Sequence, residues 1–209
     1  QARGRVDDAY QGNGQALADL SSLVTEELLV SGSCRIVGTF TEFSTGWVRL
    51  RDGLETLTPA ESTRLHTETV VDPAIQLIAR IGDTDALVTD SNLDGYALAD
   101  LIVDGTPAAL NSVGLVRTLG IQGASRGTSS DAQKTEMALR LAQAQEDFAA
   151  VEDNLATAFA ASDLVRTQLA PQAERTRASV EEIFQTFCER VLDPERATVA
   201  GDAFFDLAF

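Results

Sequence analysis

The sequence predicts an all-α protein. Apolar side chains recur at alternating intervals of three and four residues over long stretches, which places them on one face of a helix. The 209 residues include only 5 prolines, and 6% are aromatic. No stretch combines sustained period-two alternation with β-branched residues, as a half-buried strand would. We therefore expect two stacked antiparallel helical-bundle modules, residues 1–88 and 89–209, in which long helices can be shared.

Seven helices are expected in order along the chain. They cover residues 2–30, 34–56, 59–82, 93–127, 131–168 and 171–192, and a last one starts near 201. The first is marked by Leu17, Leu20, Val24 and Leu28. The second carries the stripe Ile36, Phe40, Phe43, Trp47, Leu50, Leu54 and Leu57. The fifth carries Met137, Leu141, Ala144, Phe148, Val151, Leu155 and Ala158, and the sixth carries Val180, Ile183, Phe184, Phe187 and Val191. Short connections favour antiparallel neighbours.

Helix-capping residues support several of these boundaries. Thr58 precedes Pro59, and Glu61 follows three residues after Thr58, as in a capping box with proline at the first helical position. Ser130 opens the fifth helix, and Gly127 closes the fourth. The longest break, between residues 82 and 94, is rich in Asp, Thr and Ser, and we expect the boundary between the modules there.

The charge excludes one class of partner. The chain has 32 acidic and 16 basic side chains, a formal net charge of −16. A protein that binds nucleic acid needs a basic face, which this composition does not supply. No apolar run approaches the roughly 18 residues of a membrane span. The chain starts with Gln1 and shows no signal peptide, so we expect a piece of a longer protein.

Catalytic and metal sites are poorly supported, and we expect no enzyme activity, cofactor or metal. His66 is the single histidine, which excludes a serine triad and a two-histidine metal site. The acidic residues between 83 and 94 lack the spacing of a calcium loop. Cys34 and Cys188 can form one bridge in an oxidising compartment or remain two small buried hydrophobic residues.

Two arginines are the most informative polar residues. Arg3 and Arg117 both fall at the apolar seam of an expected helix. Burying an unpaired charge there costs on the order of several kcal/mol, so each arginine needs a partner. The partner of each is either a carboxylate of the chain or an anionic ligand held by the guanidinium group. Tyr96 and His66 are further candidate ligand contacts, each with a purely structural alternative.

Several segments resemble the extracytoplasmic sensor regions of bacterial transmembrane receptors. They are Leu57-Thr58-Pro59-Ala60-Glu61-Ser62 through His66, Asp90-Ser91-Asn92-Leu93-Asp94-Gly95-Tyr96-Ala97-Leu98-Ala99-Asp100-Leu101, the stretch from Arg117 to Gly120, and Ala203-Phe204-Phe205-Asp206. That family occurs in histidine kinases, chemotaxis receptors and diguanylate cyclases. The opening Arg3-Gly4 is also similar to nitrate/nitrite-sensing helical domains, which implies a small-anion site at Arg3 and Arg117.

The resemblance implies a periplasmic ligand-sensing domain of a two-pass receptor, most often a sensor histidine kinase or a chemotaxis receptor. It further implies a homodimer, a small anion or carboxylate as ligand, and contact with the membrane only through flanking helices. In the periplasm a Cys34–Cys188 bridge is allowable. The alternative is a soluble helical structural or adaptor domain that binds a protein partner.

Overall fold

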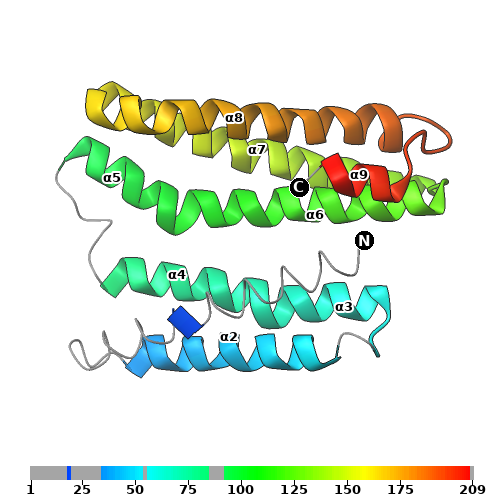
Figure 1. The fold of residues 1–209 in the computed structure, drawn as a ribbon, viewed down its shortest axis with the longest axis horizontal. Helices are drawn as coiled ribbons and strands as arrows, with labels where there is room; N and C mark the ends of the chain where they lie inside the picture. The colour runs from blue at the N-terminus through cyan, green and yellow to red at the C-terminus, as the bar shows by residue number, and fades with distance from the viewer. Residues whose placement is uncertain (1–17, 20–33, 54–55, 85–91, 208–209) are drawn as a thin grey trace. The chain divides into compact units, whose positions relative to one another are not determined.

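A computed structural model of the chain describes residues 18–19, 34–53, 56–84 and 92–207 (Figure 1). All regular structure in these residues is helical, which confirms the predicted all-α class. The chain divides into two compact units, residues 1–85 and 86–209. The sequence-based division was placed after residue 88, three residues later (88 against 85). The predicted helix over 2–30 lies outside the described residues, apart from 18–19.

The first unit contains a helical hairpin. Its elements are α2 (Cys34–Gly53), α3 (Pro59–His66), the π-helical turn η1 (Thr67–Val71) and α4 (Asp72–Thr84). The last three follow one another without a break and pack along α2. The predicted capping box begins this long helix, because the Thr58 hydroxyl accepts from Glu61 N–H and the Glu61 carboxylate accepts from Thr58 N–H at 3.0 Å.

Two small apolar clusters hold this hairpin together. Ile36 and Leu77 are buried in one of them, and Trp47, Leu50 and Val70 are buried in the other. The predicted stripe of α2 is therefore confirmed as far as Leu50. α2 is described as far as Gly53, residue 56 is no longer helical, and the half-buried Leu57 packs against the Trp47 cluster.

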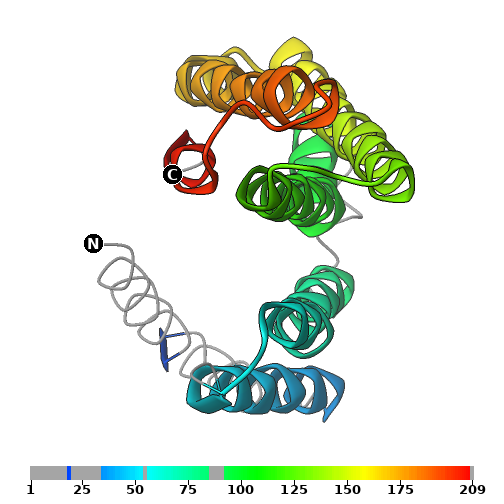
Figure 2. The ribbon, with the colours of Figure 1, turned by 90° about the vertical axis from the view of Figure 1, so that its right-hand side faces the viewer.

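The second unit contains four continuous helices in its described part. They are α5–η3–α6 (Leu93–Asp100, Leu101–Gly105 and Thr106–Arg126), α7 (Asp131–Ala161), α8–η4 (Asp163–Phe187 and Cys188–Leu192) and α9 (Gly201–Leu207). α7 packs against α5, α6 and α8, and α9 packs against α6 (Figure 2). As predicted, Gly127 ends α6 in the left-handed region with φ 74°, and Ser130 caps α7 through a capping box with Gln133.

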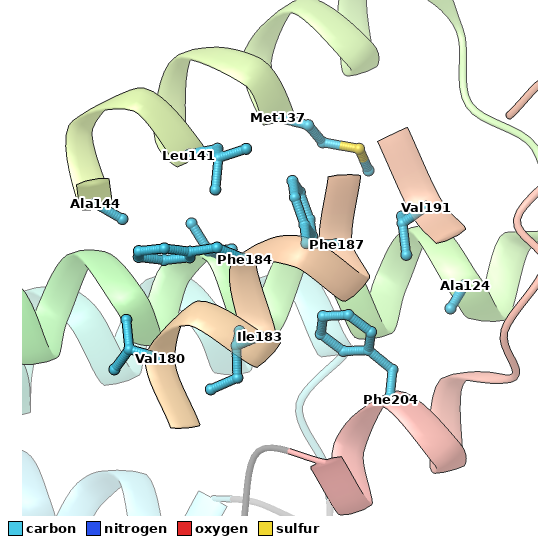
Figure 3. Close-up of a cluster of buried hydrophobic side chains, with 11 residues drawn as sticks. Ala124, Met137, Leu141, Ala144, Val180, Ile183, Phe184, Phe187, Val191 and Phe204 are labelled. Atoms are coloured by element: carbon cyan, nitrogen blue, oxygen red, sulfur yellow. The ribbon is translucent and has the colours of Figure 1, made fainter. Parts of the chain in front are cut away.

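One apolar cluster forms the core of this unit, where α6, α7, α8 and α9 meet (Figure 3). Its buried members are Val116, Ala124, Met137, Leu141, Ala144, Val180, Ile183, Phe184, Phe187, Val191 and Phe204. The predicted stripe of 180–191 is buried over its whole length. In the stripe of α7, Met137, Leu141, Ala144 and Ala158 are buried, and the other members are half-buried.

The boundary between α7 and α8 was predicted wrongly. The expected break near Pro171 does not occur, and Pro171 lies inside α8. The break is at Ser162, which has φ −144° and ψ 114° and whose hydroxyl accepts from Val165 N–H at 3.4 Å. Arg166 donates to the carbonyl of Phe159 at 2.5 Å, which satisfies an acceptor in the last turn of α7. A single capping serine therefore ends one helix and starts the next.

In the described part of the chain, each π-helical turn ends directly before an X-Pro pair. The residue before the proline donates its N–H five residues back, in the pairs Asp72 to Thr67, Thr106 to Leu101, and Asp193 to Cys188. A proline inside a helix lacks an N–H, and its ring clashes with the carbonyl four residues earlier. The wider turn moves that carbonyl aside, so the helix continues past Pro73 and Pro107, whereas at Pro194 it ends with η4.

Candidate functional site

Arg117 occupies the middle of α6, directly after the fully buried Val116. Its side chain is half-buried. Burial lowers the pKa of the Arg117 guanidinium below its ordinary value, because the charged form loses hydration. Arg117 is thus a cation at the margin of the core, as its register predicted.

A half-buried guanidinium favours an anionic partner. It presents planar N–H donors that match a carboxylate or another small oxyanion with two parallel hydrogen bonds. The partial loss of water strengthens such a contact relative to one on an open surface. Arg117 can therefore bind and orient an anion, and no proton transfer is needed for this role.

The face of α6 that carries Arg117 also receives α9. Gly120, Ile121 and Ala124 follow Arg117 by three, four and seven residues, so all four share one side of the helix. Phe204 of α9 lies against Gly120, and Gly201 lies against Ser125 and the Ile121 carbonyl. α9 thus covers this face on the carboxyl-terminal side of Arg117.

Tyr96 lies on α5 with 45% of its surface exposed. It belongs to the same continuous helix as Arg117. Their offset of 21 positions (117 − 96) corresponds to about 30 Å along a helix axis. The structure therefore does not bring Tyr96 and Arg117 together, and one small ligand cannot contact both.

The other two predicted ligand contacts lie elsewhere. His66 is exposed at the last position of α3, in the first unit. Arg3 falls outside the described residues, so its expected match to Arg117 stays a prediction. Of the three candidates that the structure describes, Arg117 is the one that lies beside a buried core.

Other chemistry in the described residues is limited. They contain no group of three or more His, Cys, Asp or Glu side chains that could hold a metal ion. No helix among them is long and apolar enough to cross a membrane. Cys188 carries a free thiol, and Cys34 belongs to the other unit, so the Cys34–Cys188 bridge stays a prediction. Burial, with Asp193 and Glu189 nearby, raises the pKa of that thiol, which keeps it protonated and weakly nucleophilic.

Sequence reasoning missed three polar contacts between distant segments of the second unit. Asn154 of α7 donates to the Asp100 carboxylate of α5 at 2.7 Å. Lys134, the single lysine, donates to the Pro194 carbonyl at 2.9 Å, beyond the end of η4. The third contact is made by Arg177 of α8, which pairs with Glu152 of α7 at 2.5 Å. The only sequence signal for the Lys134 contact was that lysine occurs once in the chain. The Asn154–Asp100 and Arg177–Glu152 contacts depend on which helices become neighbours, so the sequence held no signal for them.

Comparisons with known proteins leave the family open. No protein-family model, curated protein or solved structure matches the chain.

Proposed function

We propose that this chain is the ligand-sensing domain of a two-pass transmembrane receptor, facing the periplasm and acting as a homodimer. Its ligand is a small anion or carboxylate, and the domain itself is not catalytic. The output region is a histidine kinase or a chemotaxis signalling region. The similarity of its motif segments to extracytoplasmic sensor regions supports this proposal, and so does its all-helical architecture.

Arg117 is the observation that carries the proposal. The chain has twice as many acidic as basic residues (32 against 16), so an anion is repelled by most of its surface. Arg117, half-buried beside a core cluster, is a local exception to that repulsion. A site that must select one small anion requires such a localised cation in partly dry surroundings.

The mechanism follows from the packing around α6. This helix contacts α7, α8 and α9, so a shift at Arg117 changes several helix interfaces at once. A ligand that binds one packing better than another moves the population toward it. Packed helices respond by small sliding displacements, because their interfaces adopt discrete arrangements. Such a displacement is the signal that flanking helices carry to the membrane.

Thermal unfolding with a panel of small anions and carboxylates tests the ligand class. A ligand present at a hundredfold excess over its Kd raises the melting temperature of a domain this size by about 5–10 °C. We expect Arg117→Gln to abolish the shift. Arg126→Gln is the matched control, because Arg126 lies in the same helix and donates to the Gln122 carbonyl and side chain. If no anion stabilises the protein, or if both variants keep the shift, the anion-sensing proposal is wrong.

The gene that encodes the chain tests the receptor assignment. Apolar stretches of about 20 residues on both sides, followed by a kinase or chemotaxis region, are expected. Exposed Ile102 and Leu110, at 61% and 70% of their full surface, favour the alternative of a protein-binding adaptor. A gene without flanking membrane segments decides for that alternative.

A further inference from the structure

The Thr69 carbonyl of η1 loses the donor that an α-helix would give it. That donor would be the N–H of residue 73, which is Pro73 and has none. The turn widens instead, and Asp72 donates its N–H to the Thr67 carbonyl, five residues back. The proline ring pushes the Thr69 carbonyl out of line with the helix, so this oxygen needs room beside the helix.

Gly46 of α2 provides that room. A Cβ placed on Gly46 would overlap the Thr69 carbonyl oxygen and crowd the Thr69 Cβ, so the backbone of η1 lies directly against the bare backbone of α2. The two helices run side by side here (Figure 1), and the contact adjoins the buried Trp47 and Val70. A carbonyl oxygen this close to a glycine can accept weakly from its Cα–H.

The corresponding carbonyl before Pro194 is accommodated in a different way. It belongs to Arg190, four residues earlier, and accepts from the N–H of Thr198 at 2.8 Å. In η1, by contrast, the displaced carbonyl faces a neighbouring helix and protrudes from the surface that packs against it.

Large side chains flank Gly46 on the same face of α2. Phe43 precedes it by three residues and Leu50 follows it by four, about one turn away on either side. Both side chains belong to the apolar cluster around Trp47. If the helices slid by one turn, the Thr69 carbonyl would meet one of these side chains and not bare backbone. Packed helices shift between discrete arrangements, and this face of α2 offers one.

We infer that Gly46 and the Thr69 carbonyl displaced by Pro73 form a latch that holds α2 and the α3–η1–α4 helix in a single register. The hairpin then moves as one body, and its two helices do not slide past each other to carry a signal. The latch is independent of the proposed anion site at Arg117, which belongs to the second unit, so the failure of one leaves the other standing.

Urea unfolding of the full 209-residue chain, followed by tryptophan fluorescence, tests the close contact. Trp47 is the single tryptophan and is buried next to Gly46, so it reports on this unit. Gly46→Ala should raise the equilibrium constant for unfolding about tenfold, as an overpacked contact does. Gly38→Ala is the matched control in the same helix, because a Cβ on Gly38 meets nothing within 4 Å. It should lower that constant about two- to fivefold through helix propensity. Stabilisation by both substitutions overturns the latch.

The same two substitutions in a Pro73→Ala background test why the carbonyl protrudes. An alanine at position 73 can donate its N–H to the Thr69 carbonyl and draw it back into the helix. The effect of Gly46→Ala should then fall to about threefold or less, whereas the effect of Gly38→Ala should be equal in both backgrounds. If Gly46→Ala alone leaves Trp47 exposed without urea, Pro73→Ala should restore its burial. An undiminished effect of Gly46→Ala, or a failure to restore that burial, overturns the latch.

Spin labels on Glu42→Cys and Gln76→Cys test the register directly, in a chain whose two native cysteines are replaced by serine. Both positions are exposed, one on α2 and the other on α4. The distance between the labels, measured by double electron–electron resonance, should show one population in this parent and in Gly38→Ala. Gly46→Ala should shift that population or add a second one, because the latch cannot close. One unchanged distance in all three proteins overturns the latch, whatever their stabilities.

Discussion

Gly120 of α6 lies directly beneath the aromatic ring of Phe204 from α9. A Cβ placed on Gly120 would overlap the Phe204 ring, so no larger residue fits there without movement. Phe204 is fully buried, and its ring meets Phe187 of α8 edge to face at a centroid distance of 6.3 Å. One glycine thus allows α9 to join the core of the second unit (Figure 3).

Gly120→Val is expected to destabilise the protein by about 1–3 kcal/mol, the usual cost of overpacking a core. Gly114→Val is the matched control in the same helix, because a Cβ on Gly114 meets nothing within 4 Å. It should leave stability within about 0.5 kcal/mol of the wild type. Urea unfolding measures both variants. Equal urea midpoints for the two variants would show that the packing of Phe204 does not require a glycine at position 120.

Pro171→Ala is expected to stabilise the protein by about 1–3 kcal/mol, because a proline inside a helix removes a hydrogen bond and crowds the preceding turn. Pro171 is exposed, so the substitution deletes no core contact. Pro59 occupies the start of α3, where proline is favourable. Pro59→Ala should therefore change stability by less than about 0.5 kcal/mol. A loss of stability in Pro171→Ala contradicts the helix through residue 171.

The capping box of α3 should make stability depend on pH. The hydrogen bond from the Thr58 side chain, followed by that from the Thr58 backbone, lowers the pKa of Glu61 below its ordinary value of 4.5. The contribution of Glu61 is therefore present above pH 4.5 and is lost as the pH falls through the lowered pKa of the folded state. Wild type should exceed Glu61→Gln in stability near pH 7, and the difference should vanish in acid.

Thr58→Ala removes the other half of the same box. We expect it to cost about 1 kcal/mol near neutral pH, the typical loss for an N-cap threonine. Urea unfolding at a series of pH values measures both variants. A pH-independent difference between wild type and Glu61→Gln would mean that the carboxylate does not cap the helix.

The Cys188 thiol should react slowly. Burial, followed by Asp193 and Glu189, raises its pKa above the ordinary 9.0, so little thiolate is present near neutral pH. In a Cys34→Ser background, the rate of alkylation should rise only as the pH passes that raised pKa. The same variant in concentrated urea serves as the control and should titrate at the ordinary value. Rapid alkylation of the folded protein at pH 7 contradicts a protonated, partly buried thiol.

Most of the fold could be predicted because its signals are local. The apolar stripes of α2, α7 and α8 determine which face is buried, and the caps at Thr58, Gly127 and Ser130 determine where helices start and end. The error at Ser162 has a physical reason. Pro171 is a strong breaker in general, but an exposed helix position tolerates it, while the weaker serine signal at residue 162 coincides with the actual turn.

The candidate site could be predicted only in part. The register of Arg117 indicated a cation at the edge of the core, and the structure places it half-buried there. The expected helix over 93–127 contains both Tyr96 and Arg117, so their separation along one helix axis could be predicted from the sequence. The sequence could not show that α9 covers the Arg117 face, because that depends on which helices become neighbours.

The sequence by itself determined the helical class, the buried faces and most of the helix ends, since periodicity and capping act within a few residues along the chain. Only the tertiary structure decided that a π-helical turn precedes Pro73 and Pro107 within continuous helices. It also decided that Gly120 and Phe204, 84 residues apart (204 − 120), occupy one space. Close packing between distant segments depends on how their side chains fit together in space, which the spacing of residues along the chain does not determine.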